Sequence, residues 1–460
     1  MAAKKKTTAS KAAAAADGNR TSSSVDEMLL AALERGDDNL QTGRYFATFK
    51  EGAADAGVKS LTTDRGMRVA DARDFTDSAL SLENVADADA VVFPEIGVAL
   101  VGGPAAAEHG MAMAAAAGVA GDSAVASVDP EYFVFSTAVT DEYFRTLAAD
   151  GGSSNPGEYL RGFLRAAETI AKDLGGAPGV PAVSEHEEQA LVLGATWGLS
   201  ACRVPPSTRS GAGIKIAVLD TGMDLGHPDF AGRSITSATF VGQPVQDLHN
   251  HGTHCIGTSC GPQAPSGSTP RYGIAFRAAI FAGKVLSNSG SSVGGSVLAG
   301  MNWAIANRCE VISMSLGSQS SAQPYYTAAG QAALNAGLLM IAAAGNAGAN
   351  VPTGAPANSP TIMAVAALDA NLAPAIFSQS GKIEIAGPGV NIFSSFPRPA
   401  RYGYMSGTSQ ATPHVAGCAA LWAETSSSLR GIALRQKLMQ TARHLPFPAT
   451  RVGAGLVQAP

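Results

Sequence analysis

The chain has 460 residues, which is enough for two or three domains. Hydrophobic residues make up 46% of it and charged residues only 15%, so a large packed core can form. The formal net charge is −5 and no basic stripe runs through the body of the chain, which argues against a nucleic-acid partner. No apolar run is long enough to span a bilayer, so we also expect no membrane partner.

Residues 1–24 begin with a basic cluster and a short alanine run, but they lack the apolar core of a secretory signal peptide. Their composition is typical of a disordered tail, with a targeting peptide as the alternative. We therefore expect a cytoplasmic protein, or one that is exported without a conventional signal peptide. One short helix is predicted over residues 25–35, so residues 1–41 form a first, non-globular segment.

A compact domain is predicted between residues 42 and 137. Its pattern gives the order βαββαβ, which is typical of a ferredoxin-like α+β domain. The predicted strands cover residues 43–52, 67–75, 89–103 and 123–137, and the predicted helices cover 53–66 and 104–118. Residues 138–196 contain two helical segments among breaks rich in Gly and Pro, so we interpret them as a connector.

From residue 197 to residue 460, apolar runs alternate with amphipathic helices. This pattern predicts an α/β domain with a mostly parallel sheet covered by helices on both faces. In such a sheet the reactive side chains lie at the carboxyl ends of the strands. The predicted strands are 215–220, 278–286, 311–316, 338–345 and 361–368, and helices are predicted over 292–308 and 328–337.

The first strand of this domain ends at Asp220, where a carboxylate would face a site at the edge of the sheet. Asp224 and Asp229 follow in the next loop and are its competitors. Both lie in a polar turn, where helix capping or solvation explains an acidic residue equally well. The position at the end of a strand favours Asp220.

Three histidines follow one another closely: His249, His251 and His254. This spacing would allow a metal site with imidazole ligands, but no HExxH motif or third-ligand motif accompanies it. The alternative is a general base at the start of a helix. His251 opens the predicted helix over residues 251–259, so its ring can face the cleft, whereas His254 lies nearly one turn further and is interpreted as structural.

Asn346 and Ser409 are the remaining candidates. Asn346 follows a buried strand, where its amide can donate to a developing oxyanion, although Asn is also common in tight turns. Ser409 stands at the start of an apolar helix, whose free N–H groups and dipole favour negative charge, but a serine there can also act only as a helix cap. Gly407 allows close approach of the backbone, and we expect Pro413 to fall within the first turn of the helix.

The order Asp, His, Ser, with the strings DTG, HGTH and GTSxATPHVAG, resembles the subtilisin-like serine peptidases from about residue 197 to near the C-terminus. The resemblance implies a serine endopeptidase that acts on proteins or peptides and needs no cofactor. Ser409 would be the nucleophile, His251 the general base and Asp220 the residue that orients the imidazole. Asn346 and the backbone N–H of Ser409 would form the oxyanion hole.

The same resemblance implies substrate contacts and a pocket. Gly354 would form the floor of the S1 pocket, and since no acidic residue is visible near it, we expect a broad preference for uncharged, large P1 side chains. Cys255 follows HGTH as in the proteinase K-like branch, so a free thiol is expected beneath the histidine. The residues that would contact the substrate are Gly290, Ser315, Leu316, Gly317, Gly345 and Gly354.

The five cysteines are scattered, odd in number and contain no CxxC pair, so reduced thiols are expected rather than a disulfide framework. Asp229 matches one calcium ligand of the family, but its partners are not recognisable in this sequence. Calcium therefore stays open only as a structural ion, and not at that particular site. The cysteines are Cys202, Cys255, Cys260, Cys309 and Cys418.

The domain over residues 42–137 is similar to the propeptide of subtilases. This similarity implies a zymogen whose own N-terminal domain assists folding and inhibits the peptidase intramolecularly, with a self-made cut between about residues 138 and 196. Two other functions remain as alternatives: a metallohydrolase that uses the histidine cluster, and a catalytically silent module that binds peptides in the same cleft. The intact set of Asp220, His251, Asn346 and Ser409 argues against the silent module.

Overall fold

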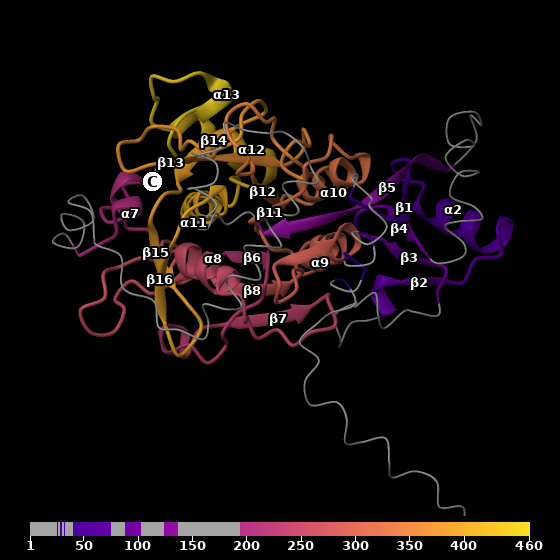
Figure 1. The fold of residues 1–460 in the computed structure, drawn as a ribbon, viewed down its shortest axis with the longest axis horizontal. Coiled ribbons are helices and arrows are strands. Elements are labelled where there is room, and N and C mark those ends of the chain that lie inside the picture. Colours follow the sequence, from indigo (N-terminus) through magenta and orange to yellow (C-terminus); the bar gives the residue numbers. More distant parts are fainter. Residues whose placement is uncertain are drawn as a thin grey trace, which may run out of the picture.

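The computed structural model describes residues 40–74, 88–102, 124–136 and 194–460, together with Val25, Met28, Leu29 and Ala32. The predicted tail, the predicted helix over 104–118 and almost all of the predicted connector lie outside these residues. Two sheets organise the described part: a parallel sheet in the C-terminal region and a mixed sheet in the N-terminal region (Figure 1). None of the helices in this part has the length and apolar character needed to cross a bilayer.

The C-terminal sheet has seven strands, all parallel, in the order β14-β13-β12-β10-β6-β8-β7. Its central strands are almost wholly buried, because helices cover both faces. All five strands predicted from the sequence are present, and the edge strands β7 and β14 are additional. The seven strands are β6 (Lys215–Asp220), β7 (Ile235–Thr239), β8 (Ala279–Lys284), β10 (Val311–Met314), β12 (Leu339–Ala343), β13 (Met363–Leu368) and β14 (Ile385–Pro388).

Alternate side chains of each strand point to opposite faces of this sheet, and the apolar core is divided accordingly. In β6, Ile216 and Val218 pack in one cluster with residues of α8 and α11, whereas Ala217 and Leu219 pack in another with residues of α9 and α10. The helix that begins at His251 and the helix that carries Ser409 therefore lie on the same face. These four helices are α8 (His251–Cys260), α9 (Gly294–Ala306), α10 (Pro324–Asn335) and α11 (Thr408–Thr425).

Smaller elements complete the C-terminal region. β15 and β16 form an antiparallel pair that packs near α8. The remaining elements are α7 (Trp197–Ala201), η3 (Pro228–Phe230), β15 (Ile392–Ser395), β16 (Tyr402–Met405), α12 (Gly431–Thr441) and α13 (Ala449–Val452).

The N-terminal sheet has the strand order β5-β1-β4-β3-β2. The single strand predicted over residues 89–103 is wrong: the chain forms the hairpin β3–β4 there, because Pro94 and Gly97 turn it back. The predicted strand over 67–75 is the short edge strand β2, which runs parallel to β3. The elements are β1 (Gln41–Phe49), α2 (Ala54–Lys59), η1 (Ser60–Asp64), β2 (Val69–Asp71), η2 (Ala72–Asp74), β3 (Ala90–Phe93), β4 (Val98–Val101) and β5 (Val125–Ser136).

This mixed sheet packs against the C-terminal region through one face. Phe46 of β1 contacts Tyr325 of α10, with ring centroids 4.3 Å apart, and the backbone N–H of Glu95 donates to Oδ1 of Asn302 in α9. The opposite face packs its own small core against α2 and η1. The fold class is therefore confirmed: an α/β domain with a parallel sheet is preceded by a smaller, mixed α+β domain.

Strand β5 belongs to both regions and is the long arrow between them in Figure 1. Its first part pairs with β1, and its last residues pair antiparallel with β9 (Ser291–Val293) on one side and with β11 (Leu316–Gly317) on the other. The N-terminal domain thus contributes the middle strand of a small sheet whose outer strands belong to the C-terminal region.

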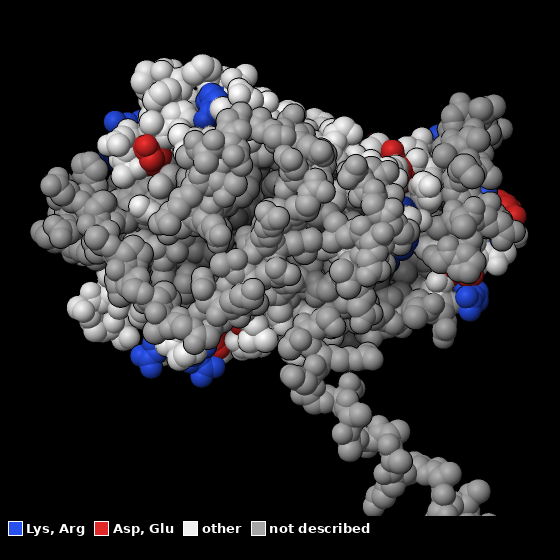
Figure 2. Space-filling model, in the orientation of Figure 1, with Lys and Arg blue, Asp and Glu red and all other residues white. Residues whose placement is uncertain are grey.

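Few charged side chains are visible among the described residues on the face that Figure 2 shows. Among the described residues of this face, Lys and Arg lie singly or in small groups near the margins, with Asp and Glu between them. The described part of this face therefore presents no continuous band of one charge.

Candidate active site

Asp220 and His251 form the first half of the site. Asp220 is the last residue of β6, and His251 is the first residue of α8. Nδ1 of His251 donates to Oδ1 of Asp220 at 2.6 Å, since an ionised carboxylate can only accept. Both side chains are buried, so water does not compete for this bond. Nε2, on the other side of the ring, makes no hydrogen bond to any described residue.

Ser409 is the second residue of α11, and Pro413 shapes its surroundings. Pro413 lies inside the helix and not in its first turn, which corrects our expectation, because α11 already begins at Thr408. A proline there has no N–H to donate to the carbonyl of Ser409. The hydroxyl of Ser315 (2.8 Å) and the thiol of Cys255 (3.6 Å) donate to this carbonyl instead. The hydroxyl of Ser409 in turn donates to the carbonyl of Ser315 at 3.0 Å.

Cys255 lies one turn after His251 in α8. It lies close both to the Asp220–His251 pair and to Ser409. Its Sγ atom lies within 4.8 Å of ligand atoms of Asp220 and His251, and it contacts the backbone of Ser409. Burial and the nearby charge of Asp220 raise the pKa of this thiol well above its ordinary value, so it is uncharged. Three residues that are far apart in the sequence therefore converge on one buried thiol.

Asn346 follows β12 by three residues and lies beside the start of α11. Its Oδ1 accepts from the backbone N–H of Thr408 at 2.9 Å and from the hydroxyl of Thr408 at 3.0 Å. The hydroxyl of Thr408 also accepts from the backbone N–H of Gly345 at 3.1 Å. Thr408 thereby fixes the orientation of the amide group, with its donor end turned away from Thr408.

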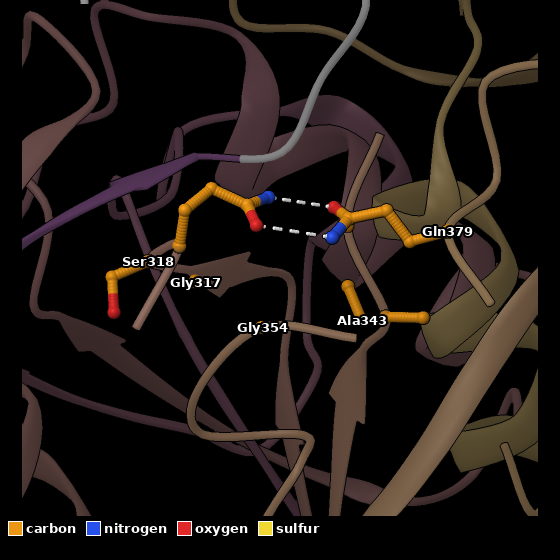
Figure 3. Close-up of a pocket in the computed structure, with 8 residues that line it drawn as sticks. Gly317, Ser318, Ala343, Gly354 and Gln379 are labelled. Carbon is orange, nitrogen blue, oxygen red and sulfur yellow. Dashed lines mark hydrogen bonds between the residues drawn. The ribbon is translucent and has the colours of Figure 1, made fainter. Parts of the chain in front are cut away.

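Three of the residues expected to contact a substrate are hydrogen-bonded to β5 or paired with it. Leu316 and Gly317 pair with Ser136 and Phe135, and the carbonyl of Gly290 accepts from the backbone N–H of Ser136 at 2.8 Å. Ser315 precedes this pairing and is bonded to Ser409, as described above. Gly345 and Gly354 line a pocket next to Asn346, and none of the described residues that line it is charged (Figure 3).

Comparison with known sequences identifies the family to which this arrangement belongs. The sequence model described as "Subtilase family" matches residues 211–455, which is more than half of the chain. The chain belongs to the subtilase family. Its site residues lie at strand ends and helix starts of the matched region.

Individual relatives agree with this assignment. Subtilisin Savinase of Lederbergia lenta is 40% identical over 269 residues, which cover 57% of this chain and 96% of that protein. A thermostable alkaline protease of Halalkalibacterium halodurans is 40% identical over 61% of this chain and 77% of its own length. Subtilisin E of Bacillus subtilis is 36% identical over 60% of this chain and 74% of its own length. This subtilase is a subtilisin-like serine endopeptidase.

The two other acidic residues of the Asp220 loop have partners of their own in this subtilase. Asp224 is bonded to the guanidinium and backbone N–H of Arg398 at 2.8–3.0 Å. Burial raises the pKa of Asp224, but the bonds from Arg398 outweigh it, and the pKa is lowered to about 2. Asp229 accepts from the phenol groups of Tyr272 (2.5 Å) and Tyr402 (3.0 Å). Neither carboxylate is bonded to a histidine of α8.

The three closely spaced histidines do not share a ligand site. The one group of metal-ligating side chains found among the described residues is Asp220, His251 and Cys255. Nε2 of His254 is bonded to the carbonyl of Ile392 at 2.8 Å, in agreement with a structural role. Burial lowers the pKa of His254 to about 3 and that of His249 to about 4, so both rings are neutral near pH 7.

Asp247 was not singled out from the sequence, although it holds the loop that leads to His251. Its Oδ1 accepts from the hydroxyl of Thr221 and from the backbone N–H of His249, and its Oδ2 accepts from the N–H and hydroxyl of Thr253. Asp247 is fully buried, so these bonds compensate a costly charge. The sequence feature that could have indicated this role is the position of Asp247, an acidic residue four positions before the predicted start of the helix.

Proposed function

We propose that Asp220, His251 and Ser409 form the catalytic triad of this peptidase, and that the chain is made as a self-processing zymogen. The observation that carries the proposal is the buried bond between His251 and Asp220 beside a serine at a helix N-terminus. Burial of the pair fixes the imidazole in one orientation, which a general base requires.

Each member of the triad has one task. The hydroxyl of Ser409 attacks the scissile carbonyl carbon, and Nε2 of His251 takes the proton of this hydroxyl. The same nitrogen then gives the proton to the leaving amine. Asp220 holds the tautomer with the proton on Nδ1 and stabilises the imidazolium while it exists. No step uses a cofactor.

The oxyanion of the tetrahedral intermediate is bound by two donors, the side-chain amide of Asn346 and the backbone N–H of Ser409. The bonds from Thr408 to Oδ1 of Asn346 support this role, because they direct the amide nitrogen to the opposite side. Ser409 occupies the second position of α11, where a backbone N–H has no acceptor within the helix.

The substrate is proposed to be a protein or peptide with an uncharged P1 residue. Among the described residues that line the pocket next to Asn346, none has an acidic or basic side chain that would pair with a charged P1 residue. We assign no calcium to Asp229, because Tyr272 and Tyr402 already donate to its carboxylate. A structural ion elsewhere would not take part in the reaction.

The N-terminal domain is proposed to inhibit the peptidase by strand addition, with β5 as a product-like peptide. Ser136, the last residue of β5, lies opposite Leu316, which follows Ser315 in the sequence. The carbonyl of Ser315 is bonded to Ser409, and the scissile bond is therefore proposed to be Thr137–Ala138. This bond lies at the start of the segment in which the sequence predicted a cut.

One buried charge anchors this domain to the peptidase. Oε1 of Glu131 in β5 accepts from the backbone N–H of Gly295, at the N-terminus of α9, at 2.7 Å. Its Oε2 accepts from Arg44 and Thr42 of β1, both at 2.5 Å. A parallel sheet with many long-range pairings folds slowly, so a domain that caps α9 and supplies a strand is also proposed to assist folding.

Labelling with a serine-directed phosphonyl fluoride tests the proposed chemistry. We expect loss of peptide hydrolysis and one label, on Ser409, whereas a zinc chelator should leave hydrolysis unchanged. Inhibition by the chelator without labelling of Ser409 would instead indicate a metallohydrolase.

A further inference from the structure

The pocket beside Asn346 has two glutamine side chains in its wall. One wall is the segment that follows β11, from Gly317 to Gln319, and the other is the end of β12, from Ala343 to Gly345. Gly354 lies between them. Figure 3 shows Gln379 reaching over this pocket, with two dashed hydrogen bonds that join it to the first wall.

Gln379 is the fixed partner. It is fully buried, and its Nε2 donates to the carbonyl of Pro352 at 2.5 Å. Its Oε1 accepts from the backbone N–H of Ala347 at 3.4 Å. A Cβ atom at Gly345, where φ is +109°, would collide with this Oε1 atom. The backbone on one side of the pocket therefore holds the Gln379 amide in one place.

Gln319 is the movable partner. Its side chain is only half-buried. Nε2 of Gln319 donates to Oε1 of Gln379 at 2.8 Å, and Nε2 of Gln379 donates back to Oε1 of Gln319 at 3.2 Å. Within the described part of the chain, these are the hydrogen bonds of the Gln319 side chain. The reciprocal pair links the two walls of the pocket through a residue that can swing into solvent.

We propose that the amide pair of Gln319 and Gln379 restricts this pocket to short, uncharged P1 side chains, so that Gln319 determines specificity. The inference rests on the proposed function, which makes this pocket the S1 site. A long P1 side chain has to push Gln319 aside and break both bonds. The buried Gln379 amide then has one N–H without an acceptor, and its Oε1 keeps only the long bond from Ala347. A short side chain leaves the pair intact.

The chain's own sequence agrees with this restriction. The residue that follows the last residue of β5 in the sequence is Thr137, which has a short, uncharged side chain. The expectation of large P1 residues, drawn from the sequence alone, took no account of the two amides. Their pairing joins residues that are 60 positions apart.

The test compares tetrapeptide p-nitroanilides of the form Val-Phe-Ser-X, where X is Ala, Thr, Leu or Phe. The full chain and the variants Gln319→Ala and Gln319→Met are assayed at equal concentrations of titrated active sites. For the wild type we expect kcat/KM to be about tenfold higher with Ala than with Phe. The Phe/Ala ratio is the kcat/KM with Phe divided by the kcat/KM with Ala. Gln319→Ala should raise this ratio about tenfold. Gln319→Met keeps the length of the side chain but cannot form the amide pair with Gln379, so it should give an intermediate ratio.

Gln331→Ala is the matched control, because Gln331 lies exposed on α10 and its side chain is bonded to Asn335 of the same helix. Its Phe/Ala ratio should equal that of the wild type. A wild-type preference for Phe over Ala, or a Gln319→Ala ratio within twofold of the wild type, would overturn the inference while leaving the proposed function in place. Absence of any Ser409-dependent hydrolysis would overturn both.

Discussion

The parallel sheet of the peptidase and the mixed sheet that precedes it contribute different things to the same cleft. In the parallel sheet all carboxyl ends meet at one edge, so Asp220, Ser315 and Asn346 arrive together from three neighbouring strands. In the mixed sheet, β5, β1, β4 and β3 alternate in direction and only β2 runs parallel to its neighbour, so the carboxyl ends do not meet at one edge. The mixed sheet supplies one extended strand, β5, and one buried carboxylate, Glu131.

This difference separates chemistry from recognition within one chain. The side chains that would react belong to the parallel sheet and its helices, and removing one should stop hydrolysis without releasing β5. β5 is held by backbone hydrogen bonds, by the carboxylate of Glu131 and by burial of its apolar residues 133–135. Weakening these contacts should release inhibition without changing the reaction. The following predictions test this division, from the largest expected effect to the smallest.

Ser409→Ala should lower kcat for peptide hydrolysis by about 10⁶-fold, because no other group can form the acyl intermediate. Folding should be unaffected, since alanine fits the space of serine. Hydrolysis of a peptide substrate and thermal unfolding, measured on the same preparation, check both statements. Ser427→Ala, an exposed serine after the same helix, should behave as the wild type. Turnover within tenfold of the wild type would remove Ser409 from the mechanism.

Asn346→Leu should lower kcat by about 10²- to 10³-fold and leave KM nearly unchanged, because an oxyanion donor acts in the transition state and not in the bound substrate. Steady-state kinetics with one short peptide separate the two constants. If KM rises while kcat is retained, Asn346 binds the substrate and does not stabilise the oxyanion.

Glu131→Gln should weaken the hold of the N-terminal domain on the peptidase by roughly tenfold, since a neutral amide keeps only part of the charge-assisted bonding to Gly295 and Arg44. The measurement is the inhibition constant of the cleaved N-terminal fragment on peptide hydrolysis. Glu51→Gln, in an exposed turn of the same domain, is the control. Equal inhibition constants for both variants would mean that Glu131 does not anchor the domain.

Asp224→Asn should reduce stability by about 1–2 kcal/mol at pH 7 without affecting kcat, since Asp224 is bonded to Arg398 and not to His251. The folded-state pKa of Asp224 is about 2, below its ordinary value of 3.8, so its ionised form stabilises the fold above pH 4. This contribution is lost as the pH falls from about 4 to about 2. Urea unfolding at several pH values measures the free energy of unfolding of the wild type and of Asp224→Asn. The difference between these two free energies should become smaller as the pH falls over that range. A difference that stays constant would contradict the assigned role of Asp224.

The parts of the site that could be predicted from the sequence are those with a local signal. Asp220 ends an apolar run, His251 and Ser409 begin helices, and Asn346 follows a buried strand. Each of these positions can be predicted from about ten neighbouring residues, because the patterns that indicate helices and strands are local. The parallel sheet was predictable for the same reason.

The parts that could not be predicted depend on contacts between distant segments. Pro413 has no N–H to donate to the carbonyl of Ser409. The hydroxyl of Ser315, which lies 94 positions before Ser409, donates to this carbonyl instead. Asp247 gains its role only when Thr221 and Thr253 approach it. The β3–β4 hairpin shows a different failure: a continuous apolar run concealed a turn at Pro94 and Gly97.

The central claim is that Ser409 cuts the chain that carries it, after β5 has entered the cleft. Intact-mass measurement of the full-length wild type and of Ser409→Ala, prepared in the same way, tests it most directly. We predict two fragments for the wild type, separated between Thr137 and Ala138, and one uncut chain for Ser409→Ala. An identical cut in Ser409→Ala, or a wild-type chain that stays whole while it hydrolyses added peptides, would contradict the claim.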